Sequence, residues 1–298
     1  LIPDGQKAIG IVRYNGLILG ALEVWARQLR RAHPDLHFYL IEPIMLAHEP
    51  ELLERFCGFI LPGSNEGHNK PYAEALLDLD TLESPRVKAY LHVLNFAHEH
   101  RLPVLGICGG HQFMGLWHKG DGMTPQDQSD KNEAVEFPAG NLLYWMLLSP
   151  QERAVLEAQC VLPYVAFKVE RMHQHAIDGR SPGVGLDVVA TSRLGTVMGV
   201  TDNVHKIGVQ FHPEMVAYAR GGEPEAEKRY KQLFESFIEL VDRAFDAHQR
   251  LGCGMAEGCD AAVFEAETYG PYKAVIERMR SCAVAQPVAV ELAEQDVI

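Results

Sequence analysis

The sequence lacks the features of a membrane-spanning or nucleic-acid-binding protein. No apolar run approaches the ~18 residues that a membrane-spanning helix needs. Basic residues are outnumbered, with 27 Lys and Arg against 40 Asp and Glu, and the net charge is -13 over 298 residues. This acidic balance disfavours polyanions and anionic lipid surfaces. We therefore expect neither a nucleic acid nor a membrane as a partner.

Cysteine is sparse, and its spacing does not match a common cysteine framework. The six cysteines include no Cys-x-x-Cys pair, and Cys253 and Cys259 are the only two that lie close in the sequence. A disulfide or a metal role for that pair is the alternative. The distribution is typical of a protein with reduced thiols rather than of a disulfide scaffold. We therefore expect a cytoplasmic location.

One cysteine stands in an unusual setting. Residues 103–115 read Pro-Val-Leu-Gly-Ile-Cys-Gly-Gly-His-Gln-Phe-Met-Gly. A short apolar strand is predicted to end at Ile107 and a helix to begin near His111, which leaves Cys108 at the corner. Glycines on both sides permit close backbone approach, and a helix N-terminus favours a thiolate. Cys108 is therefore a candidate nucleophile, and a small buried apolar residue is the alternative.

A second stretch supplies a base for this nucleophile. Residues 207–215 read Ile-Gly-Val-Gln-Phe-His-Pro-Glu-Met, a predicted strand followed by His212 and Glu214. In an extended segment, residues two apart point to the same side, so the imidazole and the carboxylate are expected to lie together. His212 can take the thiol proton of Cys108 while Glu214 orients the ring. The two stretches therefore predict a Cys-His-Glu triad.

These stretches resemble the class I glutamine amidotransferase superfamily, which uses a Cys-His-Glu triad on an α/β/α sandwich. Two further stretches are similar to its gamma-glutamyl hydrolase branch, the peptidase C26 type. One is residues 59–64, Phe-Ile-Leu-Pro-Gly-Ser, followed by Tyr-Ala-Glu at 72–74, and the other is His-Gln-His-Ala-Ile at 173–177. The resemblance covers roughly residues 7–240. It implies a flavodoxin-like fold with a mostly parallel central sheet.

The resemblance also implies an oxyanion hole. In the family, a backbone N–H at the glycine turn after the third strand helps to bind the oxyanion. That position is Gly63 or Ser64 here, and the N–H of Gly109 is the expected second donor. Two such donors stabilise a tetrahedral oxyanion by roughly 3 kcal/mol each. One departure is that the branch commonly carries Arg at the position of Gly109, and Gly there is closer to amidotransferase domains.

Substrate-binding residues are expected near the same edge of the sheet. The resemblance makes His173 the residue of the 173–177 segment that faces the substrate, and His111 and Gln112 complete the predicted set. The alternative for His173 and His175 is metal binding, but no third ligand is evident nearby in the sequence. We therefore expect neither a metal nor a cofactor.

The remaining pattern predicts the layers of the fold. Alternating strands and helices favour a parallel sheet with helices on both faces. The polar segment 116–138 is either a flap over the site or a surface insertion. Residues 1–250 are the predicted catalytic domain, and 251–298 are an extension that packs on it, joins a dimer interface or is disordered. The predicted strands are 7–13, 36–41, 58–62, 103–107, 165–171, 186–191, 197–200 and 207–211, and the predicted helices are 17–32, 51–56, 84–100, 140–158, 223–250 and 272–280.

A thiolate, a histidine base and an oxyanion hole perform acyl transfer through a thioester. The resemblance implies that the acyl group is the γ-carboxyl of glutamine or of another γ-glutamyl compound. We therefore predict a hydrolase of γ-glutamyl amide bonds. One alternative is a glutaminase subunit that delivers ammonia to a separate synthase, and another is a catalytically silent binding protein on the same fold. The expected protein partner is a second copy of the chain or that synthase.

Overall fold

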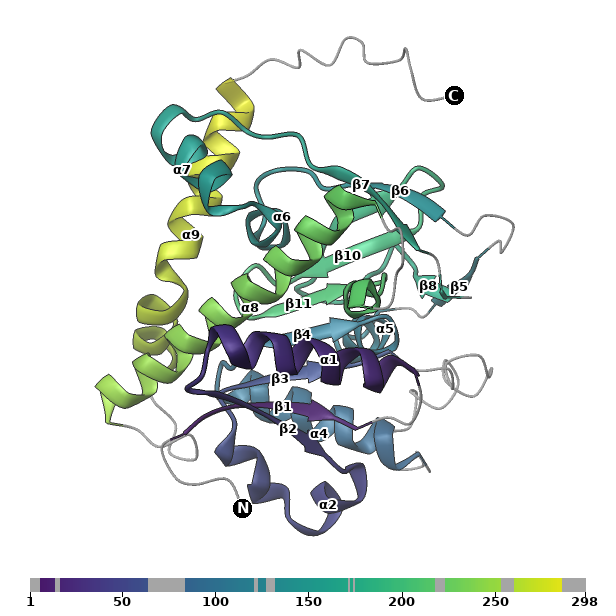
Figure 1. Cartoon of the computed structure of the whole chain (residues 1–298), viewed down its shortest axis with the longest axis vertical. Helices are drawn as coiled ribbons and strands as arrows, with labels where there is room; N and C mark the ends of the chain where they lie inside the picture. Colours follow the sequence, from purple (N-terminus) through teal and green to yellow (C-terminus); the bar gives the residue numbers. More distant parts are fainter. Residues whose placement is uncertain are drawn as a thin grey trace.

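The computed structural model is a three-layer α/β/α sandwich around one large sheet, which confirms the predicted fold class (Figure 1). It describes residues 6–13, 17–63, 84–120, 123–126, 132–170, 172–173, 175–217, 223–252 and 260–285. In this part of the chain the sheet has nine strands, in the order β2-β1-β3-β4-β11-β10-β9-β6-β7, and β5 pairs separately with β8. The strands are β1 (Lys7–Val12), β2 (Leu36–Ile41), β3 (Gly58–Leu61), β4 (Val104–Ile107), β5 (Met123–Pro125), β6 (Asn132–Glu136), β7 (Ala166–Glu170), β8 (His175–Ile177), β9 (Asp187–Ser192), β10 (Val197–Thr201) and β11 (Lys206–Val209).

The sheet has a parallel half and an antiparallel half. Strands β2, β1, β3, β4 and β11 are parallel neighbours. The pairings from β11 through β10, β9 and β6 to β7 are all antiparallel. Because β9 and β7 again run in the direction of β4, seven of the nine strands point the same way. Their carboxyl ends therefore form one edge, where parallel sheets place their sites.

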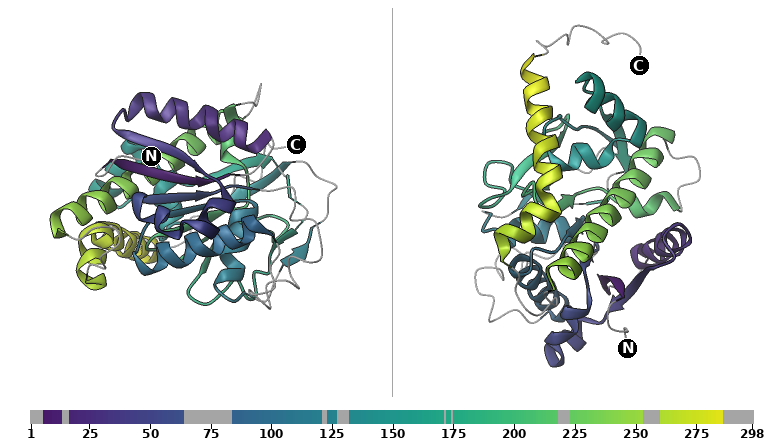
Figure 2. Two further views of the ribbon diagram at one scale, coloured as in Figure 1. Left: turned by 90° about the horizontal axis from the view of Figure 1, so that it is seen from below. Right: turned by 90° about the vertical axis from the view of Figure 1, so that its left-hand side faces the viewer.

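Helices cover both faces of the sheet. Figure 2 shows α1 and α4 on opposite sides of the strands, and α8 lies on the side of α1. Within the described residues, no helix is long and apolar enough to cross a membrane. The helices are α1 (Leu17–Ala32), α2 (Pro43–His48), α4 (Pro85–Glu99), α5 (Gly109–Trp117), α6 (Leu142–Leu147), α7 (Pro150–Gln159), α8 (Pro224–Leu251) and α9 (Ala261–Ala285), with 3₁₀ turns η1 (Pro50–Arg55) and η4 (Pro213–Ala217).

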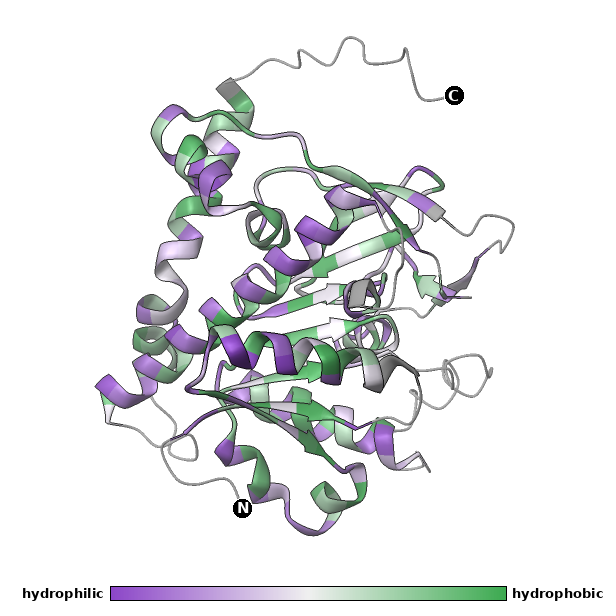
Figure 3. Ribbon diagram, viewed as in Figure 1, coloured by the Kyte–Doolittle hydropathy of each residue, from purple (hydrophilic) through white to green (hydrophobic). Residues whose placement is uncertain are grey.

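The alternation of side chains along β1 explains the two helix layers. Ile9 and Ile11 belong to the apolar cluster beneath α1 and α8, whereas Ala8 and Val12 belong to the cluster beneath α2 and α4. Successive residues of a strand point to opposite faces, so an all-apolar strand must be covered on both. Figure 3 shows the resulting pattern, with hydrophobic strands inside and hydrophilic residues on the outer faces of α1 and α8.

Several predicted segments differ from the structure: the helix predicted over 51–56 is the 3₁₀ turn η1, and the helix predicted over 272–280 is part of the longer α9. The single helix predicted over 140–158 is two helices, α6 and α7. Ser149 caps α7 in a reciprocal capping box with Glu152, and Pro150 occupies the first turn. These residues start a new helix rather than continue the old one. The segment 116–138, predicted as a flap or an insertion, contains β5 and β6, and β6 joins the main sheet.

The C-terminal helix α9 is packed on the sandwich beside α8 (Figure 2). Its Phe264, Tyr269 and Met279 are buried in the same apolar cluster as α8. The structure also pairs Cys160 with Cys282 in a disulfide that joins the end of α7 to α9 across 122 residues of sequence. The expectation of uniformly reduced cysteines is therefore wrong for this pair. The cytoplasmic location and the domain boundary at residue 250 stay predictions.

Candidate active site

Cys108 lies at the corner between β4 and α5, as the sequence predicts. Its backbone has φ 50° and ψ -101°, a conformation that L-residues rarely adopt. Such a residue stores about 1–3 kcal/mol of strain and persists only where its surroundings hold it. Those surroundings are tight, because a Cβ built on Gly110 would lie 2.0 Å from the carbonyl oxygen of Leu61. Glycine is therefore required at position 110 for the elbow to pack against β3.

His212 and Glu214 follow β11 at the same edge of the sheet. The Nδ1 atom of His212 lies 2.6 Å from Oε1 of Glu214, and the two side chains are 2% and 0% exposed. An extended segment was predicted here, but Pro213 begins the 3₁₀ turn η4, and the two side chains are brought together by that turn instead. Glu214 is thus placed to fix the ring and the tautomer of His212.

The electrostatics of His212 involve both of its neighbours. Burial lowers the pKa of His212, but the charges of Cys108 and Glu214 and hydrogen bonds with both outweigh burial and raise it well above 6.5. A histidine with a raised pKa accepts the thiol proton readily and keeps it as the imidazolium. The arrangement therefore favours the imidazolium form of His212 beside Cys108.

Gly63, at the end of β3, lies against this pair. A Cβ built on Gly63 would lie 2.6 Å from Cε1 of His212 and 3.0 Å from Cβ of Cys108. Gly109 is the first residue of α5, where backbone N–H groups have no intrahelical acceptor. The ends of β3, β4 and β11 thus meet at one point, and the two glycines border the nucleophile. Ser64 and the rest of the 64–74 loop lie outside the described residues.

Sequence reasoning missed Gln210, two positions before His212. Its side chain is completely buried, and its Nε2 atom donates to Sγ of Cys108 at 3.6 Å. Gln112 donates to Oε1 of Gln210 at 3.2 Å and to the carbonyl oxygen of His175 at 2.6 Å. One signal could have indicated it: Gln210 directly follows β11, and β11 pairs with β4, the strand that precedes the nucleophile.

The predicted substrate-binding histidines are both buried. His111 is 0% exposed and His173 is 2% exposed. Burial lowers the pKa of His111 to about 3, and the neighbouring His173 contributes in the same direction. His111 is therefore neutral at pH 7. Among the described residues, no three histidine, cysteine or carboxylate side chains gather as a metal site. The substrate-binding role of both histidines stays a prediction.

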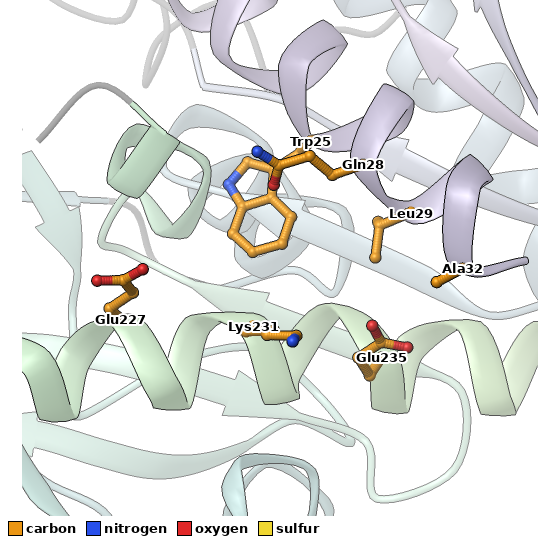
Figure 4. A pocket seen from close by; sticks show the side chains of 7 residues that line it. All are labelled: Trp25, Gln28, Leu29, Ala32, Glu227, Lys231 and Glu235. Atoms are coloured by element: carbon orange, nitrogen blue, oxygen red, sulfur yellow. The ribbon is translucent and has the colours of Figure 1, made fainter.

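A cavity of about 480 Å³ lies elsewhere, between α1 and α8 (Figure 4). Trp25 of α1 lines it, opposite Glu227, Lys231 and Glu235 of α8. Trp25 is only 6% exposed, and its ring centroid lies 4.8 Å from that of Phe234, so it packs in the core. None of the site residues predicted from sequence lines this cavity.

Comparisons with known proteins identify the family to which the chain is similar. Residues 42–214 match the family model described as Peptidase C26. The chain is 33% identical over 149 residues to an aminodeoxychorismate synthase from Streptomyces griseus, which covers 49% of this chain and 17% of that protein. It is 26% identical over 186 residues to imidazole glycerol phosphate synthase subunit HisH from Bacillus velezensis, covering 58% and 77%. The chain thus spans only a small part of the first of these relatives.

A solved structure shares the fold. The glutaminase domain of Trypanosoma brucei CTPS with bound acivicin superposes with a TM-score of 0.54 at 12% identity. The match covers 80% of this chain and 94% of that domain. At this level of identity the likeness shows a common fold.

Proposed function

Because the chain belongs to the peptidase C26 family of class I glutamine amidotransferase-like proteins, we propose that it hydrolyses γ-glutamyl amide bonds through a thioester on Cys108. The observation that carries this proposal is the position of His212, which interacts with both Cys108 and Glu214 in a buried site. A nucleophile, a base and an orienting carboxylate in this order form an acyl-transfer triad.

The first half of the reaction forms the thioester. The proton of the Cys108 thiol moves to Nε2 of His212, while Nδ1–H of the ring donates to Glu214. The thiolate attacks the γ-carbonyl carbon, and the carbonyl oxygen becomes an oxyanion. The N–H groups of Gly63 and Gly109 are the proposed donors to that oxyanion, each worth roughly 3 kcal/mol. His212 then gives its proton to the leaving nitrogen, and the C–N bond breaks.

The second half releases the acid. His212, now neutral, takes a proton from water, and the hydroxide attacks the thioester carbon. The tetrahedral intermediate collapses with loss of the Cys108 thiolate, and return of the proton from His212 to the sulfur restores the thiol and the neutral ring. The products are a free γ-carboxylic acid and ammonia or an amine. The strained elbow suits both attacks because it holds the sulfur at a fixed position.

The γ-glutamyl head group carries an α-carboxylate and an α-ammonium, which a buried pocket must pair. We propose that His111, His173 and Gln112 contribute to this pocket, together with polar residues of the 64–74 loop. The neutral state of His111 at pH 7 supports a hydrogen-bonding rather than an ion-pairing role. A site built on buried polar groups rejects analogues that leave those groups unpaired.

A glutaminase subunit that feeds ammonia to a separate synthase is the second candidate. Two observations favour it: the similarity to a named synthase subunit over 77% of that subunit, and Gly109 at the elbow. An intact buried triad disfavours the third candidate, a silent binding protein. Hydrolysis of free glutamine by the isolated chain separates the first two, because a partner-dependent glutaminase is expected to be slow alone.

The decisive assay compares γ-glutamyl-p-nitroanilide with glutaryl-p-nitroanilide, which lacks only the α-amino group. We expect a kcat/KM at least tenfold higher for the γ-glutamyl compound, since an unpaired buried polar group costs about 1–3 kcal/mol. The Cys108→Ala variant is the control and should be inactive with both. Equal kcat/KM for the two compounds would remove the γ-glutamyl assignment and leave the acyl-transfer chemistry.

A further inference from the structure

We propose that Gln210 is a further catalytic residue whose side-chain amide holds the Cys108 thiolate, and that Gln112 is a positioning residue that orients this amide. The proposal rests on the proposed function, because it requires Cys108 to be the nucleophile. The observation behind it is a directional chain of hydrogen bonds that ends on the sulfur atom.

The backbone fixes Gln210 beside Cys108. Strands β4 and β11 are in parallel register, with Ile107 opposite Val209, and each is followed directly by one of the two residues. The N–H of Cys108 donates to the carbonyl of Val209 at 2.8 Å, and the N–H of Gln210 donates to the carbonyl of Met198 at 3.0 Å. Both residues are therefore held by the sheet, and their separation is set by strand spacing rather than by a mobile loop.

The amide of Gln210 faces the sulfur with its donor end. Its Nε2 atom lies 3.6 Å from Sγ of Cys108, a normal length for a hydrogen bond to the large sulfur atom. The reversed amide would present an oxygen to the sulfur and repel a thiolate. The donor end instead makes a charge-assisted bond once the thiol is ionised, and such bonds are about twice as strong as neutral ones.

Gln112 determines which end of the Gln210 amide faces the sulfur. Its Nε2 atom donates to Oε1 of Gln210 at 3.2 Å and to the carbonyl oxygen of His175 at 2.6 Å. Because both partners are acceptors, the Gln112 amide has one favourable orientation, and this orientation occupies the oxygen of Gln210. Only the NH₂ group of Gln210 then remains for Cys108. The hydrogen bonds between Gln112 and Gln210 and between Gln210 and Cys108 are buried, and the low local dielectric strengthens both.

This arrangement gives Gln210 a role distinct from that of His212. His212 removes and returns a proton, whereas Gln210 keeps its protons and stabilises negative charge on sulfur. The contribution is largest for the free thiolate and falls when the sulfur becomes a neutral thioester. Removal of the donor should therefore reduce the population of thiolate, with less effect on substrate binding.

The test follows the rate of iodoacetamide alkylation of Cys108 across pH in Gln210→Met, Gln112→Leu and wild type, with peptide mapping to assign the label. Methionine keeps the length of glutamine but has no donor. We expect Gln210→Met to move the profile upward by about one pH unit, with about tenfold slower alkylation at pH 7. Gln112→Leu should shift it in the same direction by less, because Gln210 then rotates freely. Gln249→Met, at an exposed position of α8, should match wild type.

The outcomes separate this proposal from the proposed function. An unchanged alkylation profile in a folded Gln210→Met would overturn the role of Gln210 while Cys108 remained the nucleophile. Absence of preferential labelling at Cys108 in wild type would instead remove the proposed function. Should Gln210→Met fail to fold, Gln112→Leu decides the matter, because it leaves Gln210 in place and removes the donor to its Oε1 atom. A wild-type alkylation profile in Gln112→Leu would refute the hydrogen-bond chain.

Discussion

Substitution of Gly63 by alanine should disable the site by moving its histidine. The added Cβ would lie 2.6 Å from Cε1 of His212, whereas ordinary contact begins near 3.4 Å. The ring must therefore move by about 0.8 Å. Gly63 is absent from the glycines with positive φ, so alanine adds no backbone strain there. The effect is a steric one at the reacting groups.

The surroundings leave His212 little room to yield. Its side chain is 2% exposed and is tied to Glu214 by a 2.6 Å hydrogen bond. On the other side, the same Cβ would approach Cβ of Cys108 to 3.0 Å, and the elbow there is already strained. Displacement of a catalytic group by about 1 Å costs on the order of 10²-fold in rate, or about 2.7 kcal/mol.

We therefore expect Gly63→Ala to lose about 100-fold in kcat/KM with γ-glutamyl-p-nitroanilide while it remains folded. Thermal unfolding followed by circular dichroism checks the fold. Gly179→Ala is the matched control, because its Cβ would meet only the tip of Val197 at 3.1 Å, away from the site. Gly110→Ala should fail differently, through misfolding, since the 2.0 Å clash is with the carbonyl of Leu61. Near-wild-type activity in a folded Gly63→Ala would refute the reasoning.

Three other outcomes follow from the structure. His212→Ala should abolish turnover almost as fully as loss of the nucleophile, whereas Glu214→Gln should keep partial kcat because it still orients the ring; near-normal kcat in the alanine variant would remove the triad. Burial lowers the pKa values of His111 and His205 to about 3, so the unfolded chain binds protons below pH 6.5 that the folded chain does not. The free energy of unfolding should therefore fall as the pH is lowered from 6.5 to 5, by up to about 1.4 kcal/mol per pH unit per histidine. Urea unfolding at a series of pH values checks this, and an unchanged free energy of unfolding over that window would contradict it. Cys282→Ser should lower the free energy of unfolding by about 2–4 kcal/mol, and dithiothreitol should lower wild type to the same level without affecting the variant.

Much of the site's framework could be predicted from the sequence because its signals are local. All the residues that predict the elbow lie in one short stretch, which contains an apolar strand, flanking glycines and Cys108. His212 and Glu214 lie together in a second short stretch. The residue types and spacing within each stretch indicate its local backbone conformation, so both stretches can be predicted without knowledge of the fold. Their meeting in space was supplied by the rule that parallel strands share a carboxyl edge.

The parts that were missed depend on long-range pairing. Cys160 and Cys282 are 122 residues apart, and nothing in their neighbourhoods marks them as partners. Strands β5 and β8 are only three residues long, which is too short for an alternating pattern to be recognised. The break before α7 is a different case, because Ser149 followed three residues later by Glu152 is a readable capping box that the apolar run of α6 obscured.

Gln210 shows why the role of a side chain in the site cannot always be predicted from residue spacing in the sequence. A glutamine in a buried apolar strand looks the same in sequence whatever it contacts, and its role here depends on the direction of its amide. That direction is set by Gln112 on α5, which is in turn held by the carbonyl of His175 on β8. The parallel half of the sheet thus carries the nucleophile and base, while these hydrogen bonds connect β8 to the nucleophile. A change in the position of the His175 carbonyl is therefore expected to alter the direction of the Gln210 amide through Gln112.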